Sequence, residues 1–203
     1  MKTYTMKKVN GTPDWSKIPT LNIENVQWVD SIDITAWAQL CWDDEGLFVR
    51  MEAIEPNIRM EETGPQACTC NDSCMEFFFS PTERADYFNI ELNPNCAVWI
   101  GIGTGGDISD LIRLQISKFT EKFKTNVEFT EKGWVLTYKI PFAFIKRFFA
   151  DFEAKEGGSI RGNLYKCGDR TVKPHWMTWN YVDIDHPAFH CPEFFGTLIF
   201  GGE

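Results

Sequence analysis

The chain has 203 residues, enough for one large or two small domains, and it contains no Ser-, Pro- or Gly-rich linker. We therefore expect one domain over residues 1–203, with an irregular segment at 1–30. The net charge of −9, without any basic stripe, argues against a nucleic-acid partner bound through its phosphates. The 8 Trp and 17 Phe suffice for a large core and leave some Trp for other roles.

The ends and the cysteines of the chain carry few signals. No apolar run approaches the ~20 residues of a membrane helix, so no membrane partner is expected. The charged residues 1–8 are not followed by the apolar stretch of a secretory signal. We expect a cytoplasmic protein as given, or a secreted one if an export signal has been removed. Seven Cys cannot all pair internally, and free thiols are expected.

Short runs with a two-residue alternation of apolar side chains, separated by turn signals, predict many strands. One run, 142–152, has aromatic residues at spacings of three and four and predicts a single short helix. Residues 111–130 are ambiguous and are taken as two strands. The fold class is all-β, an antiparallel β-sandwich of immunoglobulin-like or jelly-roll-like type. The predicted strands are 36–42, 47–53, 74–80, 86–93, 97–102, 133–140, 159–167 and 195–200.

Several predicted strands present polar side chains on one face although their neighbours suggest burial. A concave sheet with such a face would bind a sugar, because sugar hydroxyls both donate and accept hydrogen bonds. Trp rings would cover the apolar faces of a pyranose, and Trp42, Trp99, Trp176 and Trp179 are candidates. The alternative is an ordinary polar outer face with its Trp in the core, as predicted for Trp134. The polar candidates are Arg50, Glu76, Asn89, Glu91, Arg161, Asn163 and Tyr165.

Two other functions use residues of the same region. Glu76 and Glu91 would be the pair of carboxylates of a glycosidase if they flanked a glycosidic bond. A haem-binding electron-transfer domain would need a His and a Met on adjacent loops as iron ligands. The chain has no C-x-x-C-H attachment motif, so any haem would be bound non-covalently. The candidates for haem ligands are His175, His190, Met75 and Met177.

Metal sites have weaker support in the sequence. The acidic turns that contain Asp43, Asp44, Asp107 and Asp110 could supply oxygen ligands to a structural calcium ion. The spacing Cys68-x-Cys70-x3-Cys74 resembles a set of thiolate ligands, but no fourth ligand lies nearby at a recognisable spacing. No other metal and no organic cofactor is expected.

The ordered series of motifs resembles the family 9 carbohydrate-binding modules and the DOMON-like sandwiches that overlap them. The matching pieces cover about three quarters of the chain. They are Trp42–Arg50, Asn71–Pro81, Tyr87–Asn93, Gly133–Phe142, Gly162–Gly168, His175–Trp179 and Phe189–Gly196.

The resemblance implies a β-sandwich that binds a small carbohydrate or the end of a glycan without cleaving it. It also implies a sugar held between two Trp rings, with polar side chains that contact the glycan end. By position, Trp179 matches the late Trp of the family, and Glu76, Asn89 and Asn163 lie on its polar strands. Trp99 and Trp42 compete for the role of the second ring, which stays open, and Trp99 is included among the candidate carbohydrate-binding residues.

Overall fold

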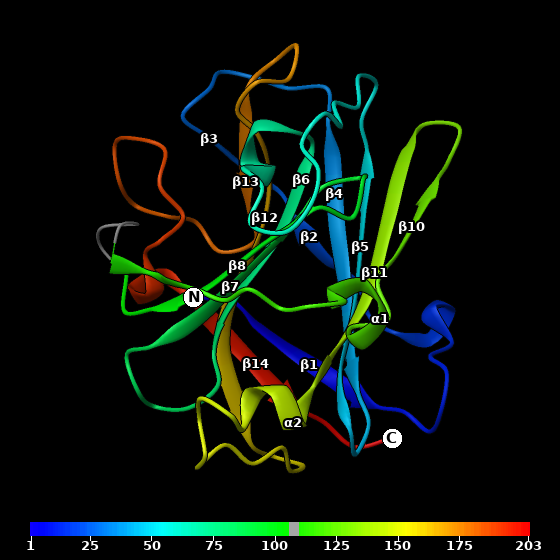
Figure 1. Ribbon diagram of the computed structural model, residues 1–203, viewed down its shortest axis with the longest axis vertical. Helices are drawn as coiled ribbons and strands as arrows, with labels where there is room; N and C mark the ends of the chain where they lie inside the picture. The colour runs from blue at the N-terminus through cyan, green and yellow to red at the C-terminus, as the bar shows by residue number, and fades with distance from the viewer. Residues whose placement is uncertain (106–109) are drawn as a thin grey trace.

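The protein is an all-β sandwich of two layers (Figure 1). The computed structural model describes residues 1–105 and 110–203, which contain 14 strands and two short α-helices. Among the helices of this part, none has the length and apolar character needed to cross a bilayer. The predicted fold class is confirmed.

We name each layer after its central strand. The β4 layer contains β2 (Leu21–Ile23), β4 (Thr35–Trp42), β5 (Gly46–Ile54), β11 (Gly133–Pro141) and β10 (Asn126–Phe129). The β6 layer contains β3 (Asn25–Gln27), β13 (His175–Thr178), β14 (Gly196–Phe200), β12 (Ser159–Gly168), β6 (Cys74–Ser80), β7 (Tyr87–Leu92), β8 (Val98–Gly103) and β9 (Ile112–Arg113).

The remaining elements join or flank the layers. Strand β1 (Thr3–Lys8) pairs with β14 at its start and with β4 at its end. The α-helices are α1 (Phe119–Lys122) and α2 (Phe142–Ile145), and the short 3-10 helices are η1 (Trp15–Lys17), η2 (Thr69–Asn71) and η4 (Pro192–Phe194).

Three sequence predictions are corrected. The segment 1–30 holds strands β1, β2 and β3, and β1 pairs in parallel with β14 of one layer and with β4 of the other. The predicted helix 142–152 is helical only over α2 and continues as turns, which bring Phe149 and Phe152 into the core. The segment 111–130 contains helix α1 between β9 and β10.

The main core lies between the two layers. Phe77 and Phe79 of β6 point into it with ring centroids 4.8 Å apart, and Trp134 of β11 is fully buried there, as predicted. A second, smaller cluster lies on the outer face of the β6 layer, where Phe189 stacks on Tyr165 at 4.2 Å. The central strands of the β6 layer are therefore buried on both faces.

A buried polar network links the layers. The ammonium group of Lys166 on β12 lies 3.2 Å from the carboxylate of Glu55, which follows β5, and 2.8 Å from His175 Nε2. Trp134 Nε1 and Ser73 Oγ also donate to Glu55, at 3.1 and 2.7 Å. Breaking such a buried pair by removing one partner costs about 3–5 kcal/mol, since the other charge stays uncompensated.

The network makes stability depend on pH through His175. Burial and the nearby charge of Lys166 lower the pKa of His175 from 6.5 to about 4. Between those values the unfolded chain binds a proton that the folded chain does not, so the free energy of unfolding falls as the pH falls. We expect the free energy of unfolding of His175→Gln to change less with pH than that of the wild type between the two pKa values. Urea unfolding at several pH values measures this.

The control is His186→Gln, because His186 is exposed and pairs with the neighbouring Asp185. It should keep the wild-type dependence. A His175→Gln curve parallel to the wild-type curve would contradict the assignment.

Candidate functional site

A cavity of about 280 Å³ opens on the outer face of the β6 layer. Its volume is close to the lower end of the ~300–1,000 Å³ range of small-molecule sites. Strands β6, β7, β8, β9, β12 and β13 reach it, together with the loops around residues 68–70 and 187–190. The lining residues are Cys68, Cys70, Glu76, Glu91, Trp99, Arg113, Cys167, Asp169, Trp176, Pro187, Ala188, Phe189 and His190.

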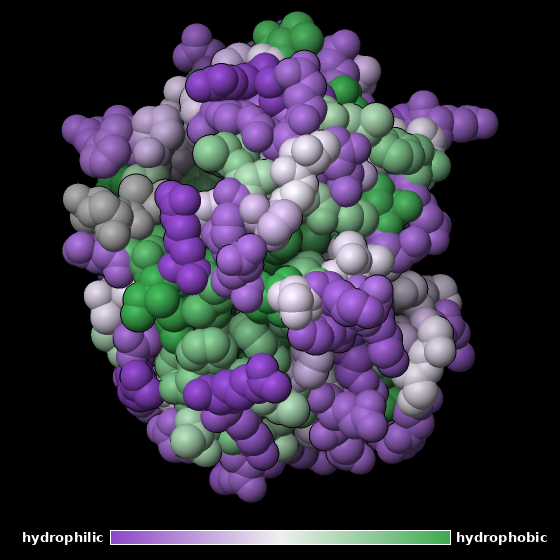
Figure 2. Space-filling view, in the orientation of Figure 1, coloured by the Kyte–Doolittle hydropathy of each residue, from purple (hydrophilic) through white to green (hydrophobic). Residues whose placement is uncertain are grey.

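The surface has further hollows besides this cavity. The face in Figure 2 is largely hydrophilic towards its edges, and apolar residues gather on its left side and lower centre. A groove of about 550 Å³ between the segment after β9 and helix α2 is lined without any Trp or carboxylate. A third hollow, of about 420 Å³, does combine Trp15 with Asp43 and Glu45, but the predicted site residues Glu76, Glu91 and Trp99 all line the outer cavity.

Strand register builds the floor of this cavity. Tyr165, Glu76, Glu91 and Trp99 are consecutive partners across β12, β6, β7 and β8. Paired residues point to the same face of a sheet, and the neighbours of Glu76 along β6 point into the main core. The structure thus brings together three residues that the sequence analysis selected, Glu76, Glu91 and Trp99, at one cavity.

The two floor carboxyls are held in a buried, hydrogen-bonded setting. Burial raises the pKa of Glu91 to about 7, although Thr69 Oγ1 and Asn89 Nδ2 donate to it at 3.1 and 3.0 Å. Burial, and next the charge of Glu91, hold the pKa of Glu76 well above its usual range. The Cys167 thiol donates to Glu76 at 2.9 Å. The floor can therefore both donate and accept protons near neutral pH.

Two indoles form apolar walls. Trp176 of β13 is partly exposed, and its Nε1 donates to Asp169 Oδ1 at 3.0 Å, which fixes the orientation of the ring. Trp99 of β8 is 5% exposed, and the guanidinium of Arg113 lies 5.4 Å from its ring centroid. The walls thus combine ring faces with one cation and one further carboxylate.

Three predicted site residues support the cavity from behind. Asn89 holds Glu91, as described above. The Tyr165 hydroxyl donates to the Phe189 carbonyl at 3.1 Å and so anchors the loop around 187–190. Asn163 exchanges two hydrogen bonds with the backbone of Asn180, its Nδ2 donating at 3.0 Å and its Oδ1 accepting at 2.9 Å. None of the three contributes to the cavity lining.

The other predicted site residues lie elsewhere, which corrects the sequence assignment. Trp179 is 3% exposed and belongs to the main core. Arg50 is on β5 in the β4 layer, where it donates to Gln39 at 2.9 Å and pairs with Glu52 at 2.5 Å. Arg161 donates to the Pro192 carbonyl at 2.8 Å. Trp42 is also in the core, with its Nε1 donating to the Gly201 carbonyl.

Sequence reasoning underrated Trp176 and missed Arg113 and Asp169. Trp176 pairs with Cys167, which shares the outer face with Tyr165, whereas Trp179 follows the end of β13. This difference depends on the register between β12 and β13, which no local pattern shows. Arg113 lies in the segment whose periodicity was ambiguous, and Asp169 follows directly after β12.

The haem arrangement is not formed. Met75 and Met177 point into the main core, His175 belongs to the Lys166 network, and His190 lines the outer cavity. The ring of His190 is hydrogen-bonded through Nδ1 to the Tyr87 hydroxyl at 2.8 Å, and burial lowers its pKa to about 4. His190 thus packs as part of the wall.

The calcium hypothesis stays a prediction. Asp43 pairs with Lys139 at 2.7 Å, and Asp44 pairs with Lys8 at the same distance. Asp107 lies outside the described residues. Asp43 and Asp44 therefore already have cationic partners, Lys139 on β11 and Lys8 on β1.

The sequence profile of carbohydrate-binding family 9 matches residues 8–200. The chain belongs to carbohydrate-binding family 9. This confirms the resemblance to the family 9 modules, and the chain is therefore a carbohydrate-binding domain. No curated protein matches this family 9 domain.

Solved structures share its fold over almost the whole length. A protein from Bacteroides uniformis ATCC 8492, for which carbohydrate binding has been proposed, is 25% identical, with a TM-score of 0.81 and coverage of 98% of this chain and 99% of that one. A family 9 module from Caldicellulosiruptor kristjanssonii in complex with glucose is 13% identical, with a TM-score of 0.70 and coverage of 100% and 97%. The complex of a family 9 module from the same organism with cellotriose, also 13% identical, has a TM-score of 0.68 and coverage of 100% of this chain and 95% of that one.

The position of Trp179 in this family 9 domain leads to a prediction. Trp179→Ala should lower the free energy of unfolding by about 3–5 kcal/mol, because it removes a large side chain from the main core. The control is Trp37→Ala on β4, since Trp37 is partly exposed and should cost much less. Urea unfolding measures both. Unchanged stability of Trp179→Ala together with lost sugar binding would contradict the core assignment.

Proposed function

We propose that the outer cavity holds one pyranose residue, as a small sugar or as the end of a glycan, and does not cleave it. The observation that carries the proposal is the convergence of Trp176 and Trp99 with Glu76, Glu91 and Arg113 on one cavity. The glucose and cellotriose complexes of the structural neighbours support a glucose-type ligand.

The cavity offers each kind of contact that a pyranose needs. The ring of Trp176 is the more accessible indole and stacks on the apolar C–H face of the sugar, with Trp99 as a second apolar wall. Arg113 donates to hydroxyl oxygens, and Asp169 accepts from hydroxyl groups. Glu91 can do either near neutral pH, because its pKa is about 7.

The arrangement of the two glutamates favours binding over hydrolysis. A glycosidase needs carboxyl groups that flank the scissile bond. Glu76 and Glu91 are direct cross-strand partners on one floor, and both are more than nine-tenths buried. They therefore approach a ligand from the same side. Their hydrogen bonds from Cys167, Thr69 and Asn89 further fix them as floor groups.

Titration calorimetry with glucose, cellotriose and a panel of other mono- and oligosaccharides tests the proposal. We expect at least one to bind, and we expect Trp176→Ala to weaken it at least about 30-fold, corresponding to about 2 kcal/mol for loss of a central aromatic contact. Trp37→Ala is the matched control and should bind like the wild type, because Trp37 lies on the β4 layer.

Two results would exclude the proposed function. One is a panel that gives neither heat nor a change in Trp fluorescence with the folded wild-type chain. The other is binding that Trp176→Ala leaves unchanged, which would place the sugar at another surface.

A further inference from the structure

We propose that Cys74, Glu76 and Cys167 form a binding site for a thiophilic divalent cation of the Zn²⁺ class, next to the floor of the outer cavity. The proposal concerns these three side chains alone and does not depend on sugar binding.

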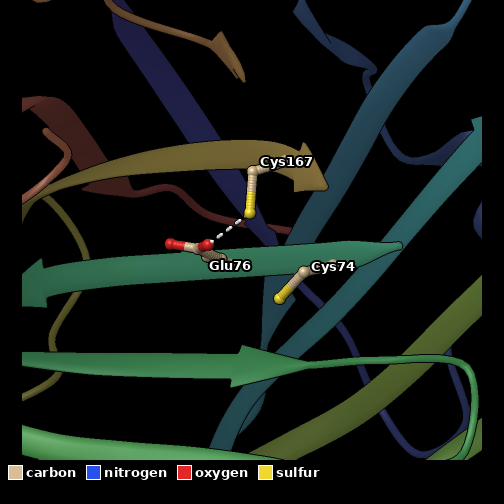
Figure 3. Close-up of side chains that lie close together, drawn as sticks. All are labelled: Cys74, Glu76 and Cys167. Atoms are coloured by element: carbon tan, nitrogen blue, oxygen red, sulfur yellow. Dashed lines mark hydrogen bonds between the residues drawn. The ribbon is translucent and has the colours of Figure 1, made fainter. Parts of the chain in front are cut away.

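Strand pairing brings the three side chains together. Cys74 and Cys167 are direct partners across β6 and β12, and Glu76 is two residues from Cys74 on the same face of β6. Figure 3 shows the Cys167 sulfur directed at the Glu76 carboxylate, with Cys74 nearby on the same strand as Glu76. One ligand atom from each residue lies within 4.8 Å of the others.

These distances are close to those of a zinc site. With Zn–S of about 2.3 Å and Zn–O of about 2.1 Å, ligand atoms around a tetrahedral ion lie about 3.6–3.8 Å apart. The set therefore needs movements of about 1 Å, which side-chain rotation supplies without a change in the strand register. The residues also come from two rigid central strands, so their backbone positions are fixed before an ion binds.

Glu76 lacks a cationic partner in the described part of the chain. It is 3% exposed, and its hydrogen bond there comes from the neutral Cys167 thiol. The neighbouring lysine on β12, Lys166, points to the other face and pairs with Glu55. Burial disfavours the ionised form of Glu76, and a divalent cation held between Glu76 and two thiolates would compensate the charge of that form.

The ligand types indicate which cation would bind. Two sulfur atoms with one carboxylate select a thiophilic ion and disfavour Ca²⁺ or Mg²⁺, which prefer all-oxygen sets. Both thiols, and the Glu76 carboxyl where it is protonated, lose their protons to solvent when they coordinate. Glu76 and Cys167 border the cavity, so the fourth position would face it and take a water molecule.

Local sequence spacing does not reveal this set, because two separate strands supply it. By spacing alone, Cys74 groups with Cys68 and Cys70, which precede it in the chain. The partner that completes the site is 93 residues away, and only the pairing of β6 with β12 brings it close.

The first test uses the reduced, metal-free wild-type chain and Co²⁺ as a spectroscopic probe without any sugar. We expect thiolate-to-cobalt charge-transfer absorption in the near ultraviolet and visible bands of a tetrahedral ion, both removed by one equivalent of Zn²⁺. Absence of the charge-transfer absorption would overturn the proposal, and this outcome needs no variant to fold.

The second test assigns the ligands by competition of Zn²⁺ with a chromophoric chelator. Cys74→Ser, Cys167→Ser and Glu76→Gln should each weaken Zn²⁺ binding at least about 100-fold, since even outer partners of metal ligands contribute about 10–100-fold. Cys96→Ser, in the turn between β7 and β8, is the matched control and should bind like the wild type. Circular dichroism confirms that each variant is folded. Wild-type affinity in Cys74→Ser and Cys167→Ser would show binding at other thiols and overturn the assignment.

Discussion

The pairing of β6 with β7 and β12 is the constraint on which the rest of the structure depends. These strands are buried on both faces, so each residue is committed either to the core between the layers or to the outer face. A shift of one residue would put Glu76 into the main core and Phe77 at the cavity. The same register that packs Phe77 and Phe79 therefore places Glu76 beside Glu91, and Cys74 beside Cys167.

The outer face is organised around this floor. Tyr165 fixes the loop of Phe189, Asn163 fixes the chain at Asn180, and Asp169 orients Trp176. Tyr165 and Asn163, which the sequence analysis assigned to sugar contact, thus act as supports, while the two indole walls come from Trp176 on β13 and Trp99 on β8. On the inner side, the pair of Lys166 and Glu55 links β12 to the β4 layer. The cavity is therefore held by the sheet below and by anchored loops above.

The two-residue period of the strands allowed much of the fold to be predicted. It placed Glu76 and Glu91 on the opposite face of their strands from Phe77 and Ile90, and so identified the residues at the floor of the cavity. It could not choose between Trp176 and Trp179, because that choice depends on how β13 pairs with β12. The aromatic spacing in 142–152 predicted a helix, although successive turns after α2 also bury Phe149 and Phe152.

The central claim is that the cavity beside Trp176 holds a sugar residue, and a crystal structure of the chain grown with cellotriose tests it most directly. The account predicts a pyranose ring against the face of Trp176, with hydroxyl groups towards Glu91 and Arg113. A sugar bound instead on the β4 layer near Arg50, with the outer cavity free of it, would contradict the account.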